Sequence, residues 1–79
     1  MTLKEKILAE FKRKNYKKDF HWVFQQYNSF WCDLPSFEKE DFTSALEELC
    51  EEGLLMCVTT FSPPHYCLTL EGEKYLYDR

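Results

Sequence analysis

The chain has 79 residues, a formal net charge of -4 and an aromatic content of 18%. This length predicts one domain, residues 1–79, whose aromatic side chains can form a core without a metal or a disulfide. No stretch has the roughly 18 consecutive apolar residues of a membrane span, and the first residues lack the apolar run of a signal peptide. We therefore expect a small, acidic, soluble protein of the reduced cytoplasm or nucleus.

The charge is divided unevenly along the chain. Residues 1–35 carry seven basic and four acidic side chains, whereas residues 36–79 carry three basic and ten acidic ones. The balance is therefore +3 in the first part and -7 in the second. Such a division indicates two surfaces of opposite charge.

The first predicted helix follows Thr2, which is a good N-cap residue. Its apolar residues recur at helical spacing and predict one buried face: Leu3, Ile7, Leu8 and Phe11. Five basic residues lie at its end and in the connection after it: Lys12, Arg13, Lys14, Lys17 and Lys18.

A second helix is predicted from Asp19, which can cap it, to Asn28. Its apolar positions also follow the helical period: Phe20, Val23, Phe24 and Tyr27. Trp22 lies beside this face, where we expect it to be partly exposed. Residues 29–35 are predicted to form an irregular turn whose apolar side chains pack under the helices: Phe30, Trp31 and Leu34.

The most strongly periodic stretch predicts a third helix, with Ser36 as its N-cap and Gly53 at its end. Its inner stripe is apolar: Phe42, Ala45, Leu46, Leu49 and Cys50. Leu46 lies at the centre of this stripe, so we expect the other elements to pack on it.

The outward face of the third helix is acidic. At about 100° per residue, seven side chains point away from the core without a lysine or arginine among them: Glu40, Asp41, Ser44, Glu47, Glu48, Glu51 and Glu52. Like charges four residues apart, such as Glu47 and Glu51, destabilise a helix. Local stability therefore does not explain this face.

Two runs rich in strand-forming residues, 54–61 and 66–70, predict a β-hairpin with Pro63 and Pro64 at its tip. With Phe61 opposite Tyr66, the core face would carry Leu55, Cys57, Leu68 and Leu70, and the other face Met56, Val58, Cys67 and Thr69. Thr69 would then cap a last helical turn, residues 70–77, anchored by Tyr75 and Leu76.

No arrangement of side chains indicates an enzyme, a metal site or a cofactor. The four cysteines contain no Cys-x-x-Cys pair, and we expect reduced thiols that serve as small core residues: Cys32, Cys50, Cys57 and Cys67. His21 and His65 have no carboxylate or cysteine at a catalytic spacing. The glycines, Gly53 and Gly72, form no phosphate-binding loop and are expected to have structural roles at helix ends.

The order of three helices, a hairpin and a closing helical turn resembles that of winged helix-turn-helix domains. Two segments carry the resemblance: ALEELCEEGLL at residues 45–55 and YCLTLEGEKYL at residues 66–76. The first is similar to the end of the third helix leading into the first wing strand, and the second to the other wing strand and the turn after it. The resemblance implies an α+β fold, mainly α, with a two-stranded antiparallel wing.

In DNA-binding members of this family, the third helix enters the major groove. The corresponding face here is acidic, so we predict a non-enzymatic module that acts through protein contacts with a basic partner or as a dimer. The carboxylates of the acidic face would contact the partner, and Trp22, Trp31 and Phe37 are predicted apolar anchors. The ordinary alternatives are a solvated acidic surface and tryptophans that pack in the core.

The alternative function is that of a DNA-binding transcriptional regulator. It would place five cations on the phosphates: Lys12, Arg13, Lys14, Lys17 and Lys18. Lys39, Thr43 and Ser44 would reach the bases if a dimer presented the third helix end-on. The ordinary interpretation of the five cations is a favourable helix C-terminus followed by a solvated loop.

Overall fold

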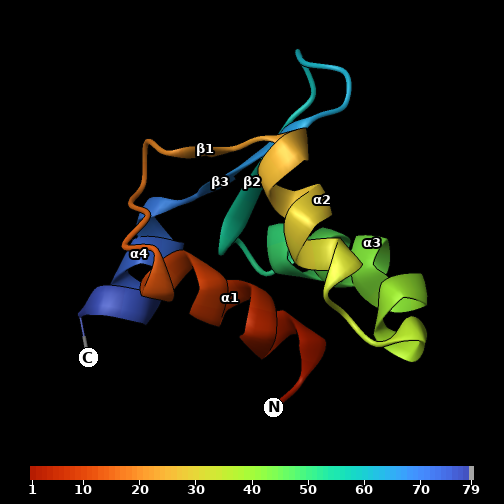
Figure 1. Ribbon diagram of the computed structural model, residues 1–79. Helices are drawn as coiled ribbons and strands as arrows, with labels where there is room; N and C mark the ends of the chain where they lie inside the picture. Colours follow the sequence, from red (N-terminus) through yellow and green to blue (C-terminus); the bar gives the residue numbers. More distant parts are fainter. Residues whose placement is uncertain (79) are drawn as a thin grey trace.

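The computed structural model describes residues 1–78 and shows an α+β fold that is mainly helical. Its elements are α1 (Leu3–Arg13), β1 (His21–Trp22), α2 (Phe24–Cys32), α3 (Ser36–Glu51), β2 (Leu55–Val58), β3 (His65–Leu68) and α4 (Leu70–Tyr77). The strands form one antiparallel sheet in the order β1-β3-β2 (Figure 1). The sheet has a third strand that was not predicted, and residues 70–77, predicted as a closing helical turn, form a regular helix with the same bounds.

α1 confirms the first predicted helix. The Glu5 backbone N–H donates to Thr2 Oγ1 (3.2 Å), and the Thr2 backbone N–H donates to Glu5 Oε1 (2.7 Å). This reciprocal pair caps the helix. Ile7, Leu8 and Phe11 are buried as predicted, on the side where α1 packs against α3.

The second helix does not begin at Asp19. His21 and Trp22 form a short strand instead, and its register places them opposite Cys67 and Tyr66 of β3. Two residues are too few to show a strand period, so the sequence around them reads as part of a helix. The strand exists because the edge of β3 offers backbone hydrogen-bonding groups that β1 can satisfy.

Trp22 is 1% exposed, so the prediction of a partly exposed side chain is wrong. Its ring centroid lies 5.0 Å from that of Phe11, 5.6 Å from that of Tyr27 and 5.7 Å from that of Phe30. Trp22 therefore sits in an aromatic cluster that joins α1, β1 and α2. A side chain in this position cannot anchor a partner.

α2 begins later than predicted and continues through most of the predicted turn. Val23 is its N-cap, and the helix includes Phe30 and Trp31. Residues 33–35 alone connect it to α3. Pro35, and not Ser36, is the N-cap of α3, because Ser36 already has helical geometry.

α3 buries four residues of its predicted inner stripe: Phe42, Ala45, Leu46 and Leu49. Cys50, the fifth, is half-buried. Glu38 also faces inward, and its carboxylate lies 2.6 Å from Lys6 Nζ on α1. After the helix, Gly53 takes a φ of 80°, which glycine adopts without strain, and the chain turns into β2.

The hairpin register differs from the predicted one. Cys57, and not Phe61, lies opposite Tyr66. Because this shift is an even number of residues, each strand residue keeps its predicted face of the sheet. Cys57 and Cys67 accordingly lie on opposite faces and both are free thiols. Leu70, which was predicted on the core face, belongs to α4 and is exposed.

α4 begins after Thr69, as predicted. The Thr69 hydroxyl oxygen accepts a hydrogen bond from the Gly72 backbone N–H (2.9 Å). Of the two predicted anchors, Leu76 is buried, whereas Tyr75 is exposed.

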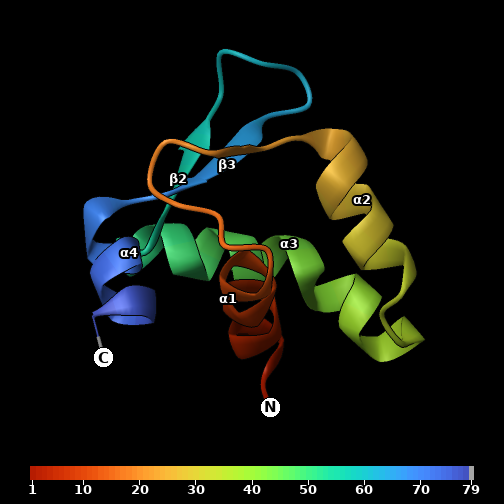
Figure 2. The ribbon, with the colours of Figure 1, turned by 60° about the vertical axis from the view of Figure 1, so that its left-hand side comes forward.

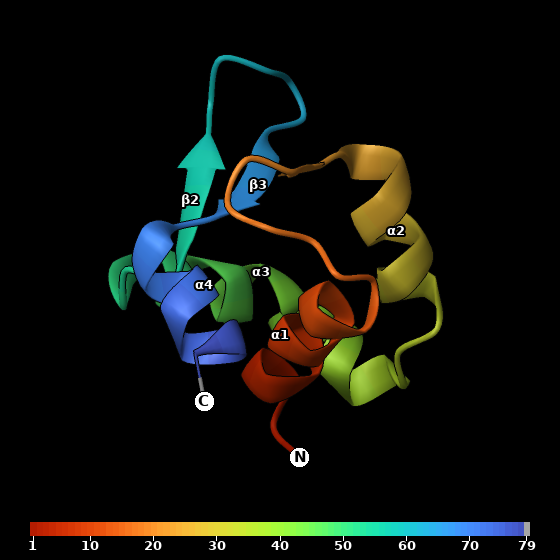
Figure 3. The same cartoon turned by 90° about the vertical axis from the view of Figure 1, so that its left-hand side faces the viewer.

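The loop at residues 59–64 projects from the sheet at one end of the molecule, on the side where α2 begins (Figure 2). The N-terminus and the end of α4 lie at the opposite end (Figures 1 and 3). α3 packs against α1, α2 and β2, so the core forms around its inner stripe.

Candidate protein-interaction surface

An apolar groove of about 400 Å³ lies between α2, α3 and the loop before β3. Tyr27 and Trp31 line it from α2, Thr43 and Leu46 from α3, and Pro64 from the loop. No pattern in the sequence indicates that these residues lie together, because the groove depends on how three separate elements pack. In the sequence, only the two prolines at the predicted hairpin tip indicate that this loop has a restricted backbone conformation.

Hydrogen bonds hold two walls of the groove in place. The Tyr27 hydroxyl donates to the Pro64 carbonyl oxygen (2.8 Å), which fastens the loop to α2. Trp31 Nε1–H donates to the Lys39 carbonyl oxygen (3.2 Å), which fastens the C-terminal half of α2 to α3. The phenol of Tyr27 is a donor at neutral pH, and burial raises its pKa above the ordinary value of 10.0, which extends this donor role to higher pH.

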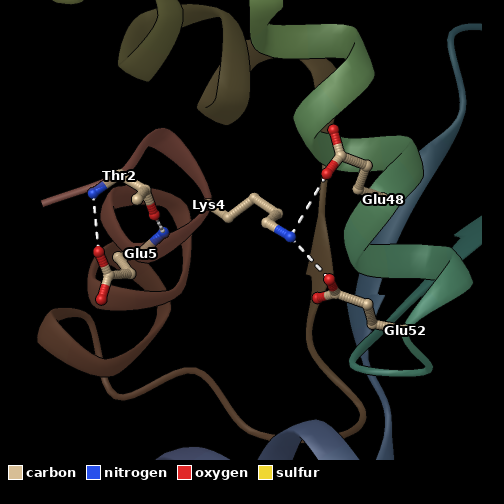
Figure 4. A network of polar contacts seen from close by, with 5 residues as sticks. All are labelled: Thr2, Lys4, Glu5, Glu48 and Glu52. Carbon is tan, nitrogen blue, oxygen red and sulfur yellow. Dashed lines mark hydrogen bonds and ion pairs between the residues drawn. The ribbon is translucent and has the colours of Figure 1, made fainter.

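All seven side chains of the predicted acidic face are exposed: Glu40, Asp41, Ser44, Glu47, Glu48, Glu51 and Glu52. Lys4 of α1 reaches two of them, because its Nζ lies 2.6 Å from Glu52 Oε2 and 3.4 Å from Glu48 Oε1 (Figure 4). The hydrogen bond with Glu52 is the main reason that the pKa of Lys4 is raised. The contact with Lys4 therefore explains why Glu48 and Glu52 are found on this face, which local helix stability could not explain.

The remaining carboxylates divide according to their position around the helix. At about 100° per residue, Glu40 and Glu47 fall on the side of Thr43, which lines the groove, whereas Glu51 falls at the middle of the outer face. Asp41 falls on the other side, with Glu48 and Glu52. Within residues 1–78, no basic side chain forms an ion pair with Glu40, Glu47 or Glu51. We call these three residues the acidic stripe.

The three predicted apolar anchors have different positions. Trp22 is buried in the core, so its assignment to an interface is wrong. Trp31 is half-buried and lines the groove. Phe37 is 70% exposed in the first turn of α3. Phe24, which was predicted to be buried, is exposed at the groove instead.

Several residues of the predicted basic patch are engaged within the chain. Arg13 donates hydrogen bonds to both carboxylate oxygens of Glu10. Lys17 Nζ lies 3.7 Å from the ring centroid of Tyr77, and Lys18 Nζ lies 3.7 Å from Asp19 Oδ1. Lys12 and Lys14 are exposed at the end of α1. The structure therefore does not gather the five cations on one surface free of acidic neighbours.

The residues predicted to reach DNA bases also differ in position. Lys39 lies against Trp31, with its Nζ 4.8 Å from the ring centroid. Thr43 borders the groove, whereas Ser44 is exposed on the outer face of α3. These three side chains do not form one polar row along the helix.

His21 and His65, which the sequence does not connect, meet across the sheet. Their Nδ1 atoms are 3.1 Å apart, which is a hydrogen-bond distance. Phe61 stacks on the ring of His65, with centroids 3.8 Å apart. The pair thus links β1 to the base of the projecting loop.

The cysteines agree with their predicted role in part. Burial raises the pKa of Cys50 and Cys67, so these thiols stay neutral. Cys32 is exposed at the end of α2, so it is not a core residue. Among residues 1–78, no three side chains of histidine, cysteine, aspartate or glutamate group so as to hold a metal ion.

No helix within the described residues is long and apolar enough to cross a membrane. Comparison of the chain with protein-family models, with curated proteins and with solved structures finds no match.

Proposed function

We propose that the chain is a non-enzymatic winged-helix module that acts through protein contacts made by α3. The order of α1, α2 and α3, followed by the β2–β3 hairpin, supports this layout. The three-residue connection between α2 and α3 also supports it, since helix-turn-helix units use connections of this length. In this layout α3 is the recognition helix and residues 59–64 are the wing.

The acidic stripe is the observation that carries the proposal. Glu40, Glu47 and Glu51 are exposed carboxylates without an intramolecular ion pair among residues 1–78. They lie on the helix that a DNA-binding relative would insert into the major groove, where the phosphates would repel them. The same charges favour fast and oriented association with a basic protein surface.

A second copy of the chain is one basic partner of this kind. Lys12 and Lys14 are exposed at the end of α1, and they could face the acidic stripe of another molecule. Sedimentation equilibrium would then show a dimer that dissociates with added salt, because exposed ion pairs are screened.

A titration with random-sequence duplex DNA at low salt tests the proposal against the alternative function. We expect no binding at micromolar protein concentration. Binding that weakens steeply with salt and is lost in a Lys12→Ala, Arg13→Ala, Lys14→Ala variant would instead assign a DNA-binding role to these cations.

Charge reversal tests the protein contact itself. The variant Glu40→Lys, Glu47→Lys, Glu51→Lys should lose partners that the wild type captures in stoichiometric amounts. A matched control, Asp33→Lys, Glu71→Lys, Asp78→Lys, changes the net charge equally at exposed positions outside α3, and it should keep them. Equal capture by all three proteins would contradict a role for α3.

A further inference from the structure

The apolar groove and part of the acidic stripe lie side by side on the surface of the protein. Thr43 lines the groove, and the helical period places Glu40 and Glu47 three residues before it and four residues after it. These two residues of the acidic stripe therefore lie along one edge of the groove. The groove volume of about 400 Å³ is within the range of about 300–1,000 Å³ found for ligand pockets.

The walls of the groove are arranged before any partner binds. The Tyr27–Pro64 and Trp31–Lys39 hydrogen bonds fix the loop and α2 against the rest of the fold. A preformed pocket reduces the ordering that a partner must impose, which favours binding. Large apolar side chains held in such pockets dominate the energetics of protein interfaces.

The charges beside the groove select the chemistry of the occupant. Glu40 and Glu47 are seven residues apart, which is about 10 Å along a helix. An extended segment covers this distance in about three residues. Lys39, the cation nearest to the groove on α3, rests over the Trp31 ring and leaves these carboxylates unpaired.

We propose that the groove binds a short segment of a partner protein in which one large apolar side chain lies between two lysine or arginine residues that are about three residues apart. The apolar side chain would enter between Tyr27, Trp31 and Pro64, and the cations would meet Glu40 and Glu47. This inference rests on the proposed function and names the partner chemistry that it requires.

Selection of peptides from a random displayed library against the purified chain tests the inference. We expect the recovered peptides to share a leucine, isoleucine, phenylalanine or methionine flanked by lysine or arginine. Synthetic copies should change the fluorescence of Trp31 as they bind, since this side chain lines the groove. Recovery of acidic peptides, or of none above background, would overturn the proposal.

Two variants separate the contribution of the groove from that of the charges. Thr43→Trp fills the groove from an exposed position and should lower the affinity for the recovered peptides by at least tenfold. A second variant, Glu40→Gln, Glu47→Gln, Glu51→Gln, should also lower the affinity for these peptides by at least tenfold, and it should remove most of the salt dependence of binding. The control, Asp41→Asn, Glu48→Gln, Glu52→Gln, neutralises the same number of carboxylates on the side of α1 and should change the affinity less than threefold.

The outcomes distinguish this inference from the proposed function. If the glutamine variant loses binding and Thr43→Trp does not, then the acidic stripe binds partners and the groove does not, so this inference alone fails. If neither variant loses binding, both fail. Self-association of the wild type that Thr43→Trp abolishes would assign the groove to a second copy of the chain and would overturn the partner proposed here.

Discussion

Gly72 lies against the backbone of Leu54, so that a Cβ on Gly72 would be 2.1 Å from the Leu54 carbonyl oxygen. The Thr69 backbone N–H donates to the same oxygen (3.1 Å), which holds the carbonyl in place. α4 can therefore approach the link between α3 and β2 only because residue 72 has no side chain. The sequence suggested a structural role for this glycine, and the fold shows which contact requires it.

Gly72→Ala should destabilise the fold, because either α4 or the Leu54 carbonyl must move to admit the methyl group. We expect a loss of about 1–3 kcal/mol in the free energy of unfolding, as for other overpacked sites. Urea unfolding measures it, with Glu71→Ala, an exposed neighbour, as the control. A loss below about 0.5 kcal/mol would mean that the close approach is not maintained in solution.

Leu46→Ala and Leu70→Ala compare the same substitution at two levels of burial. Leu46 is 2% exposed at the centre of the α3 stripe, whereas Leu70 is 52% exposed at the start of α4. Leu46→Ala should cost about 2–5 kcal/mol, because it leaves a cavity in the core. Leu70→Ala should cost well under half as much in the same urea experiment. Similar losses for the two variants would show that α3 does not organise the core.

Tyr66 should make the fold sensitive to alkaline pH. Burial, and secondly the neighbouring Cys57 thiol, raise the pKa of Tyr66 above the ordinary tyrosine value of 10.0. Its contribution to stability is present below the pKa of the unfolded chain and is lost as the pH rises through the higher pKa of the folded state. From pH 10 upward, the wild type should therefore lose stability more steeply than Tyr66→Phe. Parallel losses in a series of urea curves would contradict this assignment.

Glu5 should make the fold sensitive to acidic pH. Hydrogen bonds, first from the Thr2 backbone N–H and then from the Thr2 side chain, lower the pKa of Glu5. Its stabilisation is present above the pKa of an unfolded glutamate and is lost as the pH falls through the lower folded value. Thermal unfolding should show a constant difference between wild type and Glu5→Gln at neutral pH, and the difference should shrink in acid. A difference that persists unchanged to pH 2 would exclude the charge of Glu5 as its source.

The His21–His65 contact predicts an asymmetric pair of imidazoles. When both rings are neutral, one should carry its proton on Nδ1 and donate a hydrogen bond to the unprotonated Nδ1 of the other, because two N–H groups cannot face each other at 3.1 Å. Nitrogen NMR of the side chains reports the tautomers directly. Replacing the partner of the Nδ1-protonated ring by alanine should return that ring to the tautomer of a solvated histidine. Finding Nε2–H in both wild-type rings would show that no hydrogen bond joins them.

Local signals in the sequence determined much of the helical part of this protein. The periods of apolar residues, Thr2 and Thr69 as caps, and Gly53 as a terminator located α1, the inner stripe of α3 and the start of α4, because these signals act within one or two turns of the chain. The same period also placed the acidic residues of α3 on its exposed face. The predicted faces of the hairpin strands were correct although the predicted register was wrong, because side chains in a strand alternate with a period of two and the register shift is even.

The tertiary structure alone decided β1, the burial of Trp22 and the division of the acidic face. β1 depends on β3, more than forty residues later in the chain, so no local pattern could distinguish it from the start of a helix. Lys4 pairs with Glu48 and Glu52 because α1 packs on α3, whereas no basic side chain of residues 1–78 pairs with Glu40, Glu47 or Glu51. Periodicity shows which residues share a face, but the packing of distant elements determines what that face meets.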